Sequence, residues 1–153
     1  MKNICLVTGS RADYGLLFHL MKRINDYEDF NLQTVVTGMH LSPEFGLTIN
    51  EIIKDGFYVS KKVEMVISAD TETSISKSIG LGVISFTDAL NDIKPDLVHV
   101  RSRWPSFCFT SEIKKRKIPY VTTYHGTYSG NKNFLKKSYN KVMTYGDKII
   151  SIS

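Results

Sequence analysis

The sequence predicts an α/β protein in which helices cover both faces of a parallel sheet. Short runs of strand-forming residues alternate along the chain with longer segments whose apolar residues recur every three or four positions. Glycine, proline and polar residues separate these segments. Strands that alternate with helices favour a parallel sheet with right-handed crossovers, because a helix-length connection is needed to reach the next parallel strand. We therefore expect a three-layer architecture.

The first eighteen residues contain the clearest strand–turn–helix unit. Residues 3–8 are mostly apolar strand formers, Gly9 and Ser10 interrupt them, and residues 16–24 carry apolar side chains at helical spacing. Such a turn points the free N–H groups of the helix beyond the strand, which suits a phosphate group. Arg11 lies in this turn and could clamp a phosphate, although a solvated turn arginine is an equal alternative. The G-x-G-x-x-G dinucleotide fingerprint is absent.

The same patterns place the remaining elements in order. The further expected strands are 31–37, 57–65, 97–100, 119–124 and 148–153. The further expected helices are 43–55, 71–94, 104–117 and 133–145. Asp70 or Thr71 is expected to cap the long third helix, in which Gly80 and Gly82 allow close packing or a kink. Residues 1–153 are thus expected to form one domain built on six parallel strands, a Rossmann-like architecture.

The composition excludes several classes of protein. With 153 residues, 42% hydrophobic and 23% charged, the chain can bury a real core. We see neither a membrane span nor a signal peptide. Cys5 and Cys108 are isolated in apolar runs, which predicts buried free thiols and a cytoplasmic location. No metal-ligand spacing occurs, so we predict no metal and no cofactor.

The net charge of +5 is unevenly distributed. Residues 1–97 hold nine Lys/Arg and thirteen Asp/Glu, whereas residues 98–153 hold eleven and two. The basic part could face an anionic membrane surface, nucleotide phosphates or nucleic acid. Nucleic acid is not favoured, because aromatic residues do not interleave with the basic ones as a single-strand groove requires.

Five charged or titratable side chains are expected at one edge of the sheet. In open α/β sheets ligands bind beyond the carboxyl ends of the strands, and the loops there contain Arg11, His40, Arg101, Arg103 and His125. This set suits an anionic small molecule such as a nucleotide diphosphate. Each of the two histidines could act as a general base or phosphate donor, or be satisfied by the backbone.

One further histidine is expected to have a structural role. His99 alternates with two valines in the fourth strand, so we expect its side chain to be buried and satisfied inside the protein.

The first two-thirds of the chain resemble a known family. The stretches that carry the resemblance are 8–17 (TGSRADYGLL), 36–46 (VTGMHLSPEFG), 63–65, 77–82, 88–90 and 94–97. They are similar to the N-terminal part of hydrolysing UDP-N-acetylglucosamine 2-epimerases that feed sialic-acid-type sugars and cell-surface polysaccharide. The resemblance implies two Rossmann-like domains with the active site between them, elimination of UDP, and addition of water to give N-acetylmannosamine. It also implies that Arg11, beside Gly9, contacts a UDP phosphate and that His40 is the histidine of the second loop.

The last third resembles a different family. Residues 96–103, 118–128, 139–143 and 146–153 are similar to the N-terminal domain of family-4 glycosyltransferases, which have the two-domain GT-B architecture. This resemblance places His125 and Gly126 in the cleft, with Arg101 and Arg103 lining it, and makes His125 the candidate catalytic residue. The epimerases carry Gly-Asp-Arg and His-Gly-Gly-Glu after their fourth and fifth strands. This chain has Ser-Arg-Trp at 102–104 and His-Gly-Thr-Tyr at 125–128, so both family carboxylates are replaced.

We therefore interpret the chain as one half of a GT-B-type architecture, with an apparent join between two families near residues 95–100 and without the second domain. The expected function is UDP-sugar handling of the epimerase kind, with little turnover from this chain alone. A glycosyltransferase acceptor domain and a non-catalytic anion- or partner-binding domain are the alternatives. The expected partners are a UDP-sugar or other anionic small molecule, a second GT-B domain, an anionic membrane surface and a second copy of the chain.

Overall fold

The computed structural model describes residues 1–65, 71–124 and 134–151. Its six strands, all parallel, are β1 (Lys2–Thr8), β2 (Phe30–Thr37), β3 (Val59–Val63), β4 (Leu97–Val100), β5 (Tyr120–Tyr124) and β6 (Lys148–Ser151). Their order across the sheet is β3-β2-β1-β4-β5-β6. From β1, successive strands are added first on one side (β2, β3) and then on the other (β4, β5, β6), and in such sheets ligands bind in the loops beside this switch point, between β1 and β4. The predicted Rossmann-like fold class is confirmed.

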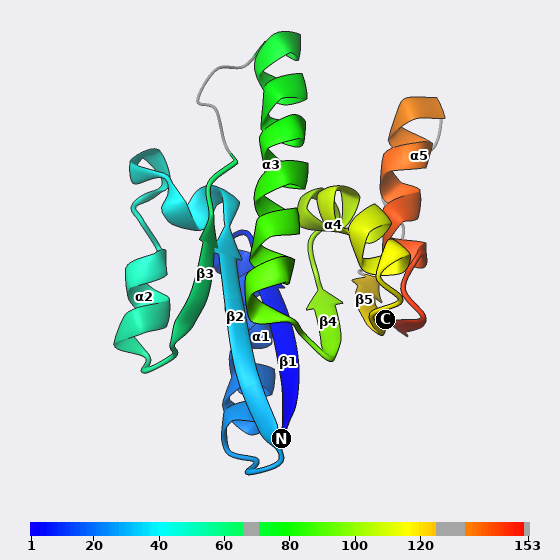
Figure 1. The fold of residues 1–153 in the computed structure, drawn as a ribbon. Coiled ribbons are helices and arrows are strands. Elements are labelled where there is room, and N and C mark those ends of the chain that lie inside the picture. Colours follow the sequence, from blue (N-terminus) through cyan, green and yellow to red (C-terminus); the bar gives the residue numbers. More distant parts are fainter. Residues whose placement is uncertain (66–70, 125–133, 152–153) are drawn as a thin grey trace.

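Helices cover both faces of the sheet (Figure 1). The α-helices are α1 (Arg11–Asn25), α2 (Ile49–Lys54), α3 (Glu72–Ile93), α4 (Arg103–Lys115) and α5 (Phe134–Lys141). Short 3-10 helices occupy Gly38–Leu41 (η1), Pro43–Phe45 (η2) and Val142–Thr144 (η3). The helix expected over 43–55 is wrong in its first half, because Gly46 and Leu47 both take positive φ values, +80° and +48°. A left-handed backbone cannot continue an α-helix, so α2 begins only at Ile49.

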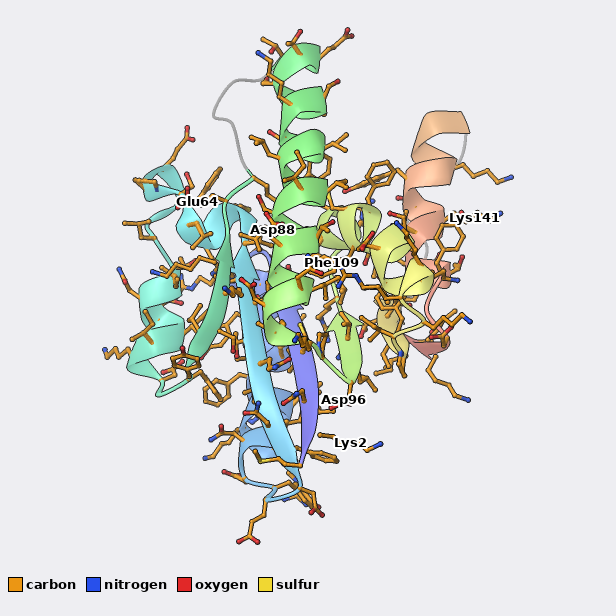
Figure 2. The ribbon with its side chains drawn as sticks, viewed as in Figure 1. Lys2, Glu64, Asp88, Asp96, Phe109 and Lys141 are labelled. Carbon is orange, nitrogen blue, oxygen red and sulfur yellow. The ribbon has the colours of Figure 1, made fainter. Side chains whose placement is uncertain are left out.

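Two hydrophobic clusters form the core, one on each face of the sheet. On one face α1 and α2 pack on β1 and β2, and Leu6 of β1 belongs to this cluster. On the other face α3 and α4 pack on the sheet, and the neighbouring residues Cys5 and Val7 belong to that cluster. This alternation is what a strand covered on both faces requires. Phe109 of α4, labelled in Figure 2, packs on Phe86 of α3, and their ring centroids are 3.7 Å apart.

Gly82 lets α3 and α4 approach closely. A Cβ at this position would lie 2.8 Å from Cε of Met65 and 2.9 Å from Sγ of Cys108. The expected close packing at Gly82 is confirmed, whereas Gly80 has open space around it. Thr71, one of the two residues expected to cap α3, is its N-cap and exchanges hydrogen bonds with Ser74. No helix within the described ranges is long and apolar enough to cross a membrane.

Candidate functional site

Three loops meet at the carboxyl end of the sheet, around the turn between β1 and α1. The backbone N–H of Met39, after β2, donates to the carbonyl of Gly9 at 3.0 Å. Gly38 takes a φ of +61°, and a Cβ there would lie 2.9 Å from the same carbonyl oxygen. On the other side, a Cβ at Gly9 would lie 3.4 Å from Cγ of Pro105, in the first turn of α4. The glycine turn is therefore held between the loops that follow β2 and β4.

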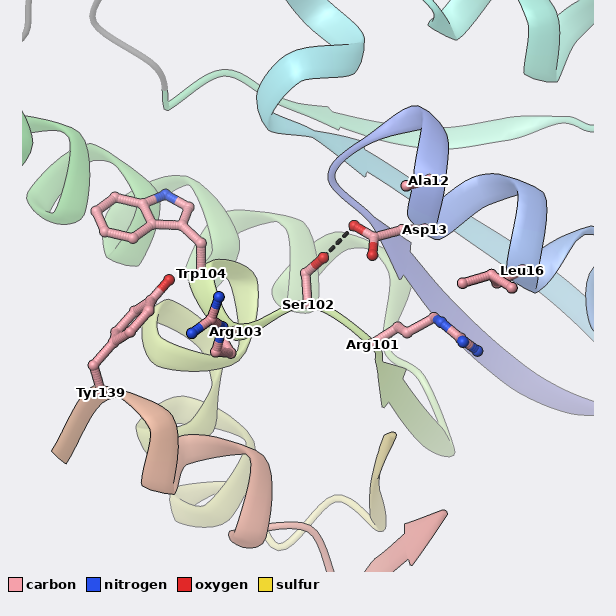
Figure 3. A pocket seen from close by; sticks show the side chains of 8 residues that line it. All are labelled: Ala12, Asp13, Leu16, Arg101, Ser102, Arg103, Trp104 and Tyr139. Carbon is pink, nitrogen blue, oxygen red and sulfur yellow. Dashed lines mark hydrogen bonds between the residues drawn. The ribbon is translucent and has the colours of Figure 1, made fainter. Parts of the chain in front are cut away.

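Two adjoining pockets open along these loops. The larger, of about 430 Å³, lies between α1, α4 and α5 (Figure 3). It is lined by Ala12, Asp13, Leu16, Arg101, Ser102, Arg103, Trp104 and Tyr139. The smaller, of about 260 Å³, is lined by Gly9, Ser10, Asp13, Thr37, Gly38, Met39, Ser102, Trp104 and Pro105. Asp13, Ser102 and Trp104 belong to both linings, so the two pockets share one wall.

Asp13 joins the first and fourth loops at this shared wall. Its Oδ2 accepts hydrogen bonds from the hydroxyl of Ser10, at 3.0 Å, and from the hydroxyl of Ser102. Figure 3 shows the Asp13 carboxylate and the Ser102 hydroxyl pointing toward each other, joined by a dashed line. Ser10 also caps α1, because its Oγ accepts the backbone N–H of Asp13 at 3.3 Å. Asp13 is the residue with a carboxylate side chain among the described residues that line the two pockets.

An aromatic and cationic wall closes the larger pocket on the side of α4 and α5. The Arg103 guanidinium lies over the Tyr139 ring at 5.4 Å and donates to Oδ1 of Asn140 at 2.7 Å. The Trp104 and Tyr139 rings have centroids 6.4 Å apart. Arg103 is thus oriented by α5, and it presents a positive charge beside two aromatic faces. Such a wall can take an anionic group next to a ring.

His99, near the end of β4, and Arg101, just after it, are both buried. Arg101 lines the larger pocket and is 7% exposed. The Nε2 atom of His99 is 2.8 Å from Oγ1 of Thr123, so the expected structural histidine is confirmed. Burial, with a smaller contribution from the Arg101 charge, lowers the pKa of His99 to about 4. His99 is therefore neutral at physiological pH.

His40 lies inside the protein, away from the linings of the two pockets. Its side chain is fully buried, with Nε2 2.9 Å from Oγ1 of Thr8 and Nδ1 2.7 Å from Oγ1 of Thr48. The Tyr14 ring packs edge-on against it, with centroids 6.4 Å apart. Burial lowers the pKa of His40. In this structure the imidazole ring links Thr8 of β1 to Thr48, just before α2. Its expected role as a general base or phosphate donor stays a prediction.

The other predicted site residues divide into three groups. Arg101, Arg103 and Gly9 line the pockets. Arg11 is exposed on the first turn of α1 and pairs with Glu51, Nε to Oε2 3.2 Å, outside either described lining. His125 and Gly126 lie outside the described residues.

The predicted site residues do not include Asp13, Ser102, Trp104 or Tyr139, which line the pockets. Asp13 lies two residues after Arg11, where an aspartate also suits the N-terminus of a helix, and Ser102 lies between Arg101 and Arg103. Trp104 directly follows Arg103. Tyr139 reaches the pocket through the packing of α5 against α4, a tertiary contact for which the local pattern gives no signal. Within the described ranges, no three His, Cys, Asp or Glu side chains are grouped as a metal site would need.

Comparison with known proteins assigns the family. The profile of UDP-N-acetylglucosamine 2-epimerases matches residues 22–102, a little over half of the chain. The chain belongs to the UDP-N-acetylglucosamine 2-epimerase family. The profile of Glycosyltransferase Family 4 matches residues 75–153, so the two matches overlap across α3 and β4. Both expected resemblances are confirmed.

Individual relatives agree with this assignment. The chain is 43% identical over 97 residues to a GDP/UDP-N,N'-diacetylbacillosamine 2-epimerase (hydrolyzing) of Campylobacter jejuni, covering 63% of this chain and 25% of the relative. It is 31% identical over 145 residues to Polysialic acid biosynthesis protein P7 of Escherichia coli, covering 93% of this chain and 37% of the relative. That alignment crosses the apparent join near residues 95–100.

A solved structure of the family has the same fold. UDP-GlcNAc 2-epimerase from Neisseria meningitidis, determined bound to UDP-GlcNAc, superposes with a TM-score of 0.72 at 16% identity, over 93% of this chain and 38% of that one. The chain thus corresponds to one Rossmann-like half of a GT-B-type architecture, and it spans roughly a quarter to two-fifths of the length of these relatives.

Proposed function

We propose that this chain is the UDP-sugar-handling N-terminal half of a hydrolysing 2-epimerase-like enzyme, and that the carboxyl-edge pockets hold the anionic part of a nucleotide sugar. The observation that carries the proposal is the larger pocket, where Arg101 and Arg103 line a cavity of about 430 Å³ beside Trp104 and Tyr139. Guanidinium groups recognise phosphate through paired hydrogen bonds, and aromatic faces suit a ring next to it. The family membership supplies the class of ligand.

The proposal includes little or no turnover from residues 1–153 alone. Elimination of UDP from a sugar needs proton acceptors and donors placed at the reacting carbons. Arg103 stands where the family pattern has its aspartate, and in the structure this arginine is fixed by Asn140 and Tyr139. The relatives are also more than twice as long as this chain, so we propose that a second domain contributes the rest of the site. We place this protein in the cytoplasm, where free thiols such as Cys5 and Cys108 persist.

UDP binding tests the proposal directly. Trp104 is the single tryptophan of the chain and borders both pockets, so UDP is expected to change its fluorescence. Arg103→Ala should weaken the apparent affinity about 10- to 100-fold, as expected when a charged hydrogen bond is lost. Arg11→Ala should also weaken it, because an exposed pair with Glu51 is weak enough for the guanidinium to turn to a phosphate.

The matched control for these variants is Arg23→Ala. Arg23 is also on α1, but in its last turn, where the guanidinium lies over the Tyr27 ring at the other end of the helix. UDP affinity should not change in this variant. Incubation with UDP-N-acetylglucosamine should yield no N-acetylmannosamine from the chain alone. Equal weakening by all three arginine variants would point to nonspecific charge attraction and contradict the proposed site.

A glycosyltransferase acceptor domain is the second candidate function. It is favoured by the family-4 match over residues 75–153 and by the arginine that replaces the epimerase aspartate. Transfer of a sugar to a lipid or glycan acceptor, after the chain is combined with a second GT-B half, would support it over the first.

A further inference from the structure

The hydroxyl of Ser102 has an unusual hydrogen-bond partner for a residue at the N-terminus of a helix. Ser102 is the N-cap residue of α4, a position where a serine side chain ordinarily accepts a backbone N–H of the first turn. Here it makes no side-chain cap, and the hydroxyl donates instead to Oδ2 of Asp13, 89 residues earlier in the chain. The cap of α4 is given up in favour of a bond between two loops.

The other contacts of Asp13 make it a rigid partner for that bond. The same oxygen accepts the hydroxyl of Ser10, while Ser10 holds the backbone N–H of Asp13, so the side chain is anchored in the first turn of α1. A carboxylate oxygen that accepts two hydroxyl donors forms strong, charge-assisted hydrogen bonds. The residues that immediately follow Ser102 are Arg103 and Trp104, which line the pocket.

We propose that Asp13 is a positioning residue of the site, whose bond to Ser102 fixes the start of α4 against the β1–α1 turn and thereby sets the positions of Arg103 and Trp104. The bond closes the shared wall of the two pockets, since Asp13, Ser102 and Trp104 line both. Without it, Pro105 in the first turn of α4 still lies near Gly9, but the start of α4 loses its hydrogen bond to α1. A displacement of about 1 Å in such a wall is enough to weaken ligand binding or catalysis strongly.

Ser102→Ala tests this role with two readouts on the full chain. The first is quenching of Trp104 fluorescence by acrylamide, which needs no ligand; its quenching constant should rise about twofold as the wall loosens. The second is the affinity for UDP, which should fall about fivefold or more. This second readout rests on the proposed function. Ser102→Thr keeps a hydroxyl and should restore both values.

A matched control and a double-mutant cycle separate positioning from general stability. Ser76→Ala removes one hydroxyl bond, to the carbonyl of Glu72 in α3, and should change neither readout. Ser102→Ala should add little when Asp13 is already alanine, because the bond that it removes is then absent; Asp13→Ala alone also removes the bond from Ser10.

The outcomes distinguish this role from the proposed function. If the wild-type chain does not bind UDP while Ser102→Ala still exposes Trp104, the proposed function fails and the positioning role stands. If Ser102→Ala leaves quenching at the level of Ser76→Ala, Asp13 does not position this wall, whatever the affinity for UDP.

Discussion

Alanine in place of Gly38 is expected to lower the free energy of unfolding by about 2–4 kcal/mol. Two costs add at this position. The backbone is left-handed, with a φ of +61°, and a Cβ costs about 1–2 kcal/mol in that conformation. The new Cβ would also lie 2.9 Å from the carbonyl oxygen of Gly9, a backbone atom that already accepts a hydrogen bond from Met39. Relief would require the loops after β1 and β2 to separate.

Gly46 provides the matched control for this substitution. It is also left-handed, with a φ of +80°, but no atom lies within 4 Å of a Cβ built there. Gly46→Ala should therefore show only the backbone cost, about 1–2 kcal/mol. Urea unfolding followed by circular dichroism measures both variants. If the two alanines cost the same, the contact between Gly38 and Gly9 does not constrain the loops.

The variant also has a consequence for the site. Gly9 and Gly38 both line the smaller pocket, so a forced separation of their loops should reshape it. We expect the environment of Trp104 to change in Gly38→Ala, and not in Gly46→Ala, when tryptophan emission is compared below the unfolding transition. Gly38 thus connects the packing of the sheet to the geometry of the pockets.

The sequence was sufficient for the architecture because each strand and helix carries its own pattern. The expected strands 31–37, 97–100 and 119–124 differ from β2, β4 and β5 by no more than one residue at either end. The helix expected over 43–55 was too long because its apolar residues, Phe45 among them, continue through a segment whose backbone is left-handed at Gly46 and Leu47. The spacing of apolar side chains does not reveal the backbone conformation, so a positive φ at Leu47 could not be predicted from it.

The candidate site was only partly predictable, for a related reason. Topology places loop residues at the carboxyl edge of a parallel sheet, and Arg101, Arg103 and Gly9 do line pockets there, while their role in binding stays a prediction. It does not say whether a loop side chain points outward or into the protein, and His40, fully buried between two threonines, points inward. Tyr139 enters the wall only because α5 packs beside α4.

The pH dependence of stability should depend strongly on His99. Burial lowers the pKa of this histidine to about 4 in the folded protein, whereas an unfolded chain has a value near 6.5. Between these values the unfolded state binds more protons, so stability falls as the pH falls. The stabilisation is complete above the unfolded pKa, and going from pH 7 to pH 5 should remove about 2 kcal/mol through this group alone.

His99→Gln isolates this contribution, because glutamine does not titrate and carries an amide that can bond to Thr123 in place of the imidazole. The variant can be less stable than the wild type at pH 7, but its loss of free energy between pH 7 and pH 5 should be smaller by about 2 kcal/mol. His40, whose pKa is also lowered by burial, accounts for part of the slope that remains. His19→Gln, on the exposed side of α1, serves as the control that removes a histidine without touching either buried ring. An unchanged slope in His99→Gln would mean that burial does not hold His99 neutral in the folded protein.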